Sequence, residues 1–139
     1  MSIPEIAKLR VGDMLEPMIH TPISRTTLAL FAGASGDHNP IHIDIDFAKS
    51  VGMDDVFAHG MLGMAYLGRF LTSIADQRNI RSYSVRFSSI TQVGAKLKCI
   101  GKVKEITDTS AERLMTIELS ATDQNNDVKL IGDAVIAFQ

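Results

Sequence analysis

The chain has 139 residues, of which 45% are hydrophobic and 22% charged, and 14 basic side chains nearly balance 16 acidic ones. This length and composition are typical of one compact globular domain, which we expect to span residues 1–139. A net charge of −2 offers no basic surface for a nucleic-acid backbone, so DNA and RNA are not expected partners. The single cysteine cannot form an internal disulfide, and no uncharged stretch is long enough to span a membrane. We therefore expect a cytoplasmic protein without an export signal or a membrane segment.

The first part of the sequence predicts short elements separated by turns. An extended segment is expected around residues 14–19. Ser24 can begin a helix that ends at Gly36, because a serine oxygen accepts hydrogen bonds from free N–H groups and glycine tolerates the left-handed conformation after a helix. Residues 44–51 predict a second short helix, although the alternating isoleucines at its start also permit a strand.

Residues 60–74 predict a long buried helix. Arg69 is its only charged residue, and apolar side chains occur on nearly every side, as expected of a helix that is covered all round. Gly63 and Gly68 each destabilise a helix by up to about 1 kcal/mol relative to alanine. We therefore expect a neighbouring element to pack closely against the backbone at both glycines.

From residue 82 onward, apolar and polar side chains alternate with a period of two, which is typical of half-buried strands. Strands are expected near residues 82–88, 96–107, 115–121 and 128–138, with a polar turn at residues 123–127. Consecutive strands joined by such turns favour an antiparallel meander. With one apolar helix, the simplest arrangement is an α+β fold in which an antiparallel sheet curls around a long central helix.

The loop that holds Asp37 and His42 contains the first candidate for catalysis. The two residues are five positions apart across Pro40, so the turn can direct both side chains into one pocket. A carboxylate and an imidazole that contact the same water form a general acid/base pair. The same spacing also occurs by chance, and an aspartate beside Asn-Pro is often only a turn former.

His59 and Gly60 form a second candidate, because they stand directly before the apolar helix. A helix N-terminus presents unpaired N–H groups with about half a positive charge, and Gly60 lets a substrate oxygen approach the backbone without a Cβ in the way. Such donors can stabilise the developing charge of an enolate. The alternative is an ordinary helix start in which His59 is buried, hydrogen-bonded and structural.

The histidines and aspartates of residues 38–46 also permit a zinc or iron site. Pro40 and a capping role for Asp44 account for these residues without a metal, and their spacing matches no recognised ligand pattern. We expect no metal and no other cofactor. Cys99 is expected to be a small core residue and not a nucleophile. The sequence has no Gly-x-Ser-x-Gly elbow and no phosphate-binding glycine loop, so serine-nucleophile chemistry and nucleotide hydrolysis lose support.

Two motifs resemble the MaoC-like, (R)-specific enoyl-thioester hydratase/dehydratase family: residues 31–42, FAGASGDHNPIH, and residues 58–62, AHGML. Residues 83–87, YSVRF, and the order of the strands are also similar, so the resemblance extends over most of the chain. It is strongest to single hot-dog members, including the subunits that dehydrate 3-hydroxyacyl-carrier-protein in mycobacterial fatty-acid elongation.

The resemblance implies a hot-dog fold, activity on an acyl-CoA or acyl-carrier-protein thioester, and a homodimer or a heterodimer with a related subunit. It assigns Asp37 and His42 as the catalytic pair and Gly60 as the backbone donor to the thioester carbonyl. Candidate substrate-binding residues are Asn39, which helps to hold the loop, together with His59, Met61, Met64 and Arg86. The implied reaction is reversible hydration of trans-2-enoyl thioesters in fatty-acid metabolism.

Two other functions remain open at this point. A hot-dog acyl-thioester hydrolase would direct water at the carbonyl carbon instead of C3, which leaves His42 without a clear role. A non-catalytic subunit would only stabilise a heterodimer, and the presence of Asp37, His42 and Gly60 argues against it.

Overall fold

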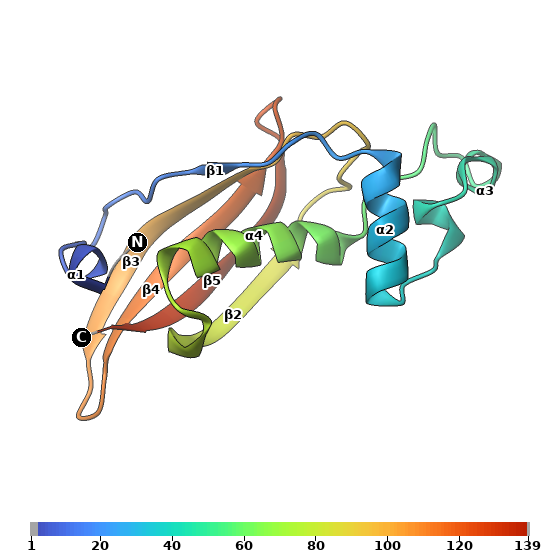
Figure 1. Cartoon of the computed structure of the whole chain (residues 1–139). Helices are drawn as coiled ribbons and strands as arrows, with labels where there is room; N and C mark the ends of the chain where they lie inside the picture. Colours follow the sequence, from blue (N-terminus) through green and yellow to red (C-terminus); the bar gives the residue numbers. More distant parts are fainter. Residues whose placement is uncertain (1–2, 139) are drawn as a thin grey trace.

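The computed structural model describes residues 3–138 of the chain, with side chains from Glu5 onward (Figure 1). Its helices are α1 (Ile3–Ile6), α2 (Arg25–Ser35), α3 (Ile45–Ser50) and α4 (Gly60–Ile74), with two short 3-10 helices, η1 (Pro40–His42) and η2 (Gln77–Asn79). Its strands are β1 (Met18–Ile19), β2 (Ile80–Phe87), β3 (Lys98–Asp108), β4 (Arg113–Thr122) and β5 (Val128–Phe138). Over these residues, no helix has the length and hydropathy needed to cross a lipid bilayer.

Within the described residues, the strands form one antiparallel sheet in the order β1-β3-β4-β5-β2. The neighbours β3, β4 and β5 are consecutive in the chain, which confirms the predicted meander for these three strands. The prediction is wrong for β2, which pairs with β5, with Val85 opposite Gly132, and not with β3. Alternation shows which residues share a face of a strand, but it does not specify the neighbouring strand.

The helix α4 lies along one face of the sheet, which curves around it (Figure 1). Leu67, Phe70 and Leu71 are at most 1% exposed and pack in the main core with side chains of β3, β4 and β5. A Cβ at Gly63 would lie 2.7 Å from the side chain of Leu130, so the predicted close approach occurs at this glycine. It does not occur at Gly68, where a Cβ would make only an ordinary contact at 3.7 Å.

The opposite face of α4 is open in the described chain. Met61 is 55% exposed, and Ala65 and Arg69, one and two turns further along the same face, are also exposed. The prediction that the helix is covered on every side is therefore wrong for a single chain, because one sheet covers only one face of a helix. The open face is apolar near its N-terminal end and is available to a ligand or a partner.

The residues that cap α2 and α3 are those predicted from the sequence. The Ser24 side chain accepts a hydrogen bond from a backbone N–H in the first turn of α2, and Gly36 ends that helix in the left-handed conformation with φ 75°. The Asp44 side chain accepts two backbone hydrogen bonds at the start of α3. Residues 45–50 are therefore helical, with Asp44 and Val51 as the caps, and the alternative of a strand is excluded.

A second apolar cluster connects these helices to α4. It contains Leu28 of α2, Ala48 of α3 and Leu62 of α4, all buried. The two short helices lie beyond the N-terminal end of α4 and away from the sheet (Figure 1). The connecting loop, residues 36–44, is thereby held near the first turn of α4.

Cys99, on β3, is 0% exposed and belongs to the main core, as predicted. Burial raises the pKa of its thiol to about 12. A thiolate is the nucleophilic form of cysteine, so this position does not favour nucleophilic chemistry.

Candidate active site

Asp37 lies just after α2, in a loop that its neighbours hold in shape. Its carboxylate accepts a hydrogen bond from the Asn39 N–H (3.2 Å), and the Asn39 side chain accepts one from the Ile41 N–H (3.2 Å). The Asp37 N–H donates to the Ser35 hydroxyl oxygen (3.2 Å). The Asp-x-Asn-Pro sequence therefore does form a turn, and Asn39 holds the loop. The Asp37 side chain nevertheless remains exposed, which leaves it accessible to a ligand.

His42, at the end of η1, is buried with 8% of its surface exposed. Its Nδ1 lies 2.7 Å from the carbonyl oxygen of Phe57. A carbonyl oxygen only accepts, so Nδ1 is the donor and carries the proton. In the neutral ring Nε2 then has a free lone pair and is the nitrogen that can act as a base.

His59 lies behind this pair and is 2% exposed. Its Nε2 donates to the backbone carbonyl of Asp37 (3.1 Å), and its ring stacks on His42 with centroids 4.0 Å apart. Burial lowers the pKa of His59, and the neighbouring His42 lowers it further against the opposing effect of the hydrogen bond to Asp37. A neutral His59 therefore supports both the Asp37 loop and the His42 ring.

Asp37, His42 and His59 converge on one small region. One ligand atom from each, a carboxylate oxygen and two ring nitrogens, lie within 4.8 Å of one another. One water can therefore contact both the carboxylate and the imidazole, as a general acid/base pair requires. The same three groups are close enough to be considered for a metal ion.

The arrangement of the two imidazoles does not favour a shared metal. Their planes are inclined by only 28° and stacked 4.0 Å apart. A metal is bound in the plane of each ring, about 2.0–2.1 Å from the nitrogen. Two nearly parallel stacked planes do not meet at such a point, so His42 and His59 would have to unstack before both could ligate one ion.

An apolar groove of about 470 Å³ runs from Asp37 along the open face of α4. Its lining consists of Phe31, Ser35, Asp37, Met61, Met64, Ala65, Gly68 and Tyr83. Two candidate binding residues, Met61 and Met64, are thus brought together with Asp37. Asn39 and His59 do not line the groove, but their hydrogen bonds to Asp37 hold the loop that carries it.

Gly60 is the first residue of α4, and no side chain caps this end of the helix. The residue lines a separate hollow of about 380 Å³, together with Phe57, Phe87 and Lys129. A Cβ at Gly60 would lie 3.1 Å from the Phe87 ring. Gly60 therefore lies between this hollow and the Asp37 groove, whose lining includes the next residue, Met61.

Arg86 is not part of this site. Tyr83 faces α4, where its hydroxyl donates to the Met64 carbonyl (2.6 Å), and Phe87 faces Gly60. Because side chains alternate along a strand, Arg86 points to the other face of the sheet. There it lines a hollow that also contains Lys102. The expectation that Arg86 lines the same site as Asp37 is wrong, because Arg86 lies on the opposite face of β2 from Tyr83 and Phe87.

Two features of the site were missed by sequence reasoning. Tyr83 lines the groove, and the alternation of β2 could have identified it as an inward-facing residue. The other feature is the backbone carbonyl of Phe57, which sets the tautomer of His42. No side-chain pattern encodes a backbone acceptor, so this contact could be found only in the structure.

Two buried histidines predict loss of stability in acid. Burial lowers the pKa of His59 and of His20, whose ring stacks on Tyr66. The positive charge of Arg69 lowers the pKa of His20 further. Each group is neutral in the folded chain, and the unfolded chain binds protons more readily, with a pKa of 6.5. The contribution of these two histidines to the free energy of unfolding is therefore fully present above pH 6.5. The free energy of unfolding should fall as the pH decreases below that value. Urea unfolding at about pH 7.5 and about pH 5.5 measures this loss.

The His20→Leu variant is the control for the acid effect, because it removes one of the two titrating rings. It should lose less stability than the original chain between the same two pH values. Equal losses in both proteins would assign the acid sensitivity to other groups.

Comparison with known proteins gives consistent matches. A family model described as MaoC like domain matches residues 7–125. The chain is 22% identical over 137 residues to the mitochondrial 3-hydroxyacyl-[acyl-carrier-protein] dehydratase of Arabidopsis thaliana. The aligned region covers 99% of this chain and 81% of that protein. Among solved structures, it is similar to the unliganded (R)-hydratase PhaJ1 from Pseudomonas aeruginosa, with a TM-score of 0.84, 25% identity, and 96% of this chain and 84% of that chain covered.

The fold is also similar to that of the ChsH1-ChsH2 complex from Mycobacterium tuberculosis. Here the TM-score is 0.79 at 19% identity, with 94% of this chain and 98% of that chain covered. Together with the sheet order and the central helix, these likenesses confirm the predicted α+β hot-dog fold.

Proposed function

The chain belongs to the MaoC-like domain family, and on that premise we propose that it catalyses the reversible addition of water to trans-2-enoyl thioesters, giving (R)-3-hydroxyacyl thioesters. The observation that carries the proposal is the convergence of the Asp37 carboxylate and a His42 nitrogen within 4.8 Å, at the end of an apolar groove. The dehydratase named among its relatives supports the same chemistry in the reverse direction.

In the proposed reaction, Asp37 and His42 hold one water between them while the Gly60 N–H binds the thioester carbonyl oxygen. His42 Nε2 takes a proton from the water, because Nδ1 is already a donor to Phe57. The water oxygen adds at C3 of the substrate, and negative charge develops on the carbonyl oxygen. The uncapped N-terminus of α4 stabilises that charge, and the proton that His42 took from the water is then delivered to C2, which completes the addition.

The same groups remove water from a 3-hydroxyacyl thioester in the opposite direction, since both directions pass through one transition state. Met61 and Met64 would contact the substrate in the groove, where their flexible side chains adapt to different acyl groups. We propose an acyl-CoA or acyl-carrier-protein thioester as substrate and the cytoplasm as the place of action.

We also propose that the working form is a dimer. β2 is an edge strand of the sheet, and the open face of α4 exposes Met61 beside it. Edge strands and apolar faces are commonly covered by a second subunit. Light scattering should therefore give twice the chain mass of 15.2 kDa. A monomer with full activity would disprove this expectation, and a mass above 15.2 kDa only in mixtures with a related subunit would indicate a heterodimer.

Crotonyl-CoA tests the proposed function against its two alternatives. A hydratase consumes the enoyl group, which is followed by its absorbance, while the thioester stays intact. A hydrolase releases a free thiol, and a non-catalytic subunit does neither. Loss of the enoyl absorbance without thiol release supports the proposal, and it should persist after treatment with EDTA because the mechanism uses side chains and a helix terminus. A bound metal whose removal abolishes turnover would contradict this mechanism.

A further inference from the structure

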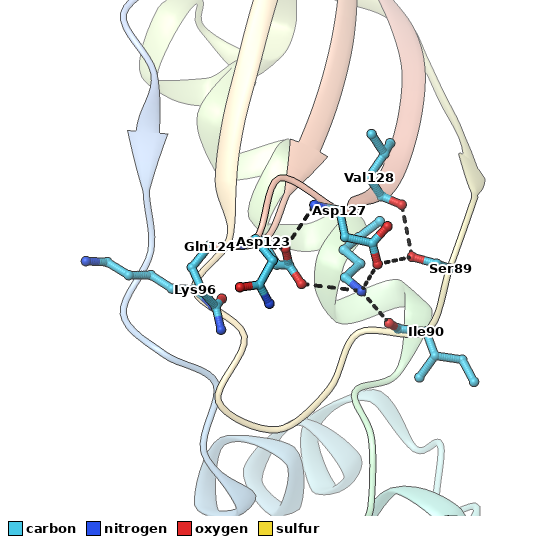
Figure 2. Close-up of polar contacts among 9 residues, drawn as sticks. Ser89, Ile90, Lys96, Asp123, Gln124, Asp127 and Val128 are labelled. Carbon is cyan, nitrogen blue, oxygen red and sulfur yellow. Dashed lines mark hydrogen bonds and ion pairs between the residues drawn. The ribbon is translucent and has the colours of Figure 1, made fainter.

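Lys129, on β5, is a buried cation outside the groove. It is 4% exposed, and its Nζ donates to the Asp127 carboxylate (2.6 Å) and to the Ile90 carbonyl (2.9 Å). A carboxylate oxygen of Asp123 lies 3.5 Å from the same Nζ and completes the cluster. Figure 2 shows the partners Asp123, Asp127 and Ile90 gathered around this contact. A buried charge is stable only when such partners replace its water. The burial of Lys129 therefore carries a desolvation cost that calls for a functional explanation.

The local backbone directs Lys129 into this position. The register of β4 and β5 changes at this residue: Ala121 pairs with Leu130, and Thr122 pairs with Val128. Lys129 is therefore the extra residue of a β-bulge, and both it and Leu130 are buried. Bulges re-aim a side chain at sheet edges and next to active sites.

The segment that receives this lysine runs beside the start of the candidate active site. The residue after Ile90, Thr91, accepts a hydrogen bond from the Ala58 N–H (2.9 Å), and Gln92 forms a β-bridge with Phe57. The Phe57 carbonyl is the group that accepts the His42 Nδ1 proton. A continuous series of contacts thus connects the Lys129 ammonium to His42, and the segment of residues 57–58 leads directly into His59 and Gly60.

We propose that Lys129 is a positioning residue, which holds residues 90–92 against residues 57–58 and so fixes the His42 base and the Gly60 N–H relative to each other. This inference rests on the proposed hydration reaction. Lys129 and His42 are the side chains at the two ends of this series, and the contacts between them are made by the backbone of residues 57–58 and 90–92.

The fold does not depend on the Lys129 side chain alone. The Ser88 N–H donates to the Lys129 carbonyl (2.9 Å), and the Ser89 hydroxyl donates to the Val128 carbonyl (2.9 Å). These contacts keep the 88–89 segment attached to β5 when the ammonium group is removed. We therefore expect a Lys129→Met variant to fold, with a displaced loop at residues 90–92.

The test measures both turnover and the His42 hydrogen bond. A misplacement of about 1 Å can lower kcat by roughly 10²-fold. The Lys129→Met variant should displace His42 by less than that, so we expect its kcat to fall about 10-fold. KM should stay within about twofold, because Lys129 does not line the Asp37 groove. In NMR spectra of the ¹⁵N-histidine-labelled protein, the His42 Nδ1 proton should exchange with solvent faster than in the original chain.

Two further variants separate positioning from general stability. Lys129→Arg keeps a cationic donor next to a hollow that has room for a larger side chain, and it should recover most of the lost kcat. Lys104→Met removes an exposed lysine that pairs with Asp133, and it should leave kcat and proton exchange unchanged.

The outcomes are distinct. If the original chain hydrates crotonyl-CoA and folded Lys129→Met keeps its kcat and its Nδ1 exchange rate, the positioning role is overturned. A lower melting temperature and lower kcat with an unchanged exchange rate also overturn it, because Lys129 then serves stability only. If the original chain has no hydratase activity, the proposed function fails, while faster Nδ1 exchange in Lys129→Met still supports the connection to His42.

Discussion

Asp37→Asn and His42→Ala should each lower kcat by roughly 10²-fold or more while the chain stays folded, as expected for the loss of a positioned acid or base. The amide introduced by Asp37→Asn cannot take up a proton, although its oxygen can still accept the hydrogen bond from the Asn39 N–H that shapes the loop. Removal of the His42 ring takes away the Nε2 lone pair. Steady-state kinetics with crotonyl-CoA, normalised to the folded fraction from circular dichroism, measure the effect.

Matched controls lie in the same part of the chain. His38→Ala removes an exposed histidine of the same loop, and Asp54→Asn removes an exposed carboxylate beyond α3. Both should keep near-normal turnover. Asp37→Asn or His42→Ala with a kcat close to that of these controls would eliminate the proposed pair.

Gly60→Val should lower kcat by roughly 10²–10³-fold, which corresponds to the loss of one oxyanion donor worth about 3–4 kcal/mol. The substitution keeps the backbone N–H but places a branched side chain where the thioester oxygen is proposed to bind. If Gly60 is only an ordinary helix start, the variant should instead have a lower melting temperature and nearly unchanged turnover per folded molecule. Comparison of the melting temperature with kcat therefore decides between the two roles.

The neighbouring Phe87 ring requires a control for this experiment. A new Cβ at residue 60 would lie 3.1 Å from that ring, which is 51% exposed and can rotate away. Combining Gly60→Val with Phe87→Ala removes the steric conflict. Recovery of kcat in the double variant would assign the defect to Phe87 and not to the carbonyl-binding N–H. Gly33→Val, at a helical glycine with open space around it, reports the cost of the substitution alone.

Local features of the fold were predictable because short-range chemistry determines them. Ser24 and Asp44 have side-chain oxygens that cap helices, and Gly36 tolerates a positive φ, so the ends of the short helices follow from the residues themselves. The loop with Asp37 and His42 was identifiable for a similar reason, since a turn centred on Pro40 brings together residues that are close in sequence.

Longer-range features were not predictable from the same patterns. The alternation of β2 was evident, but its pairing with β5 depends on the path of the chain after α4. That path decides that Tyr83 faces the groove and Arg86 faces away. The open side of α4 was missed for a related reason: Met61 has the same apolar character whether a sheet, a ligand or another subunit covers it.

The position of the oxygen transferred from water tests the central claim most directly. Crotonyl-CoA incubated with the protein in H₂¹⁸O should give a product that carries ¹⁸O on C3 with the thioester intact, as mass spectrometry of the product and its fragments can show. Label in a free carboxylate would instead indicate attack on the carbonyl carbon by a hydrolase. Either that result or no incorporation by the correctly assembled protein would contradict hydration by Asp37 and His42.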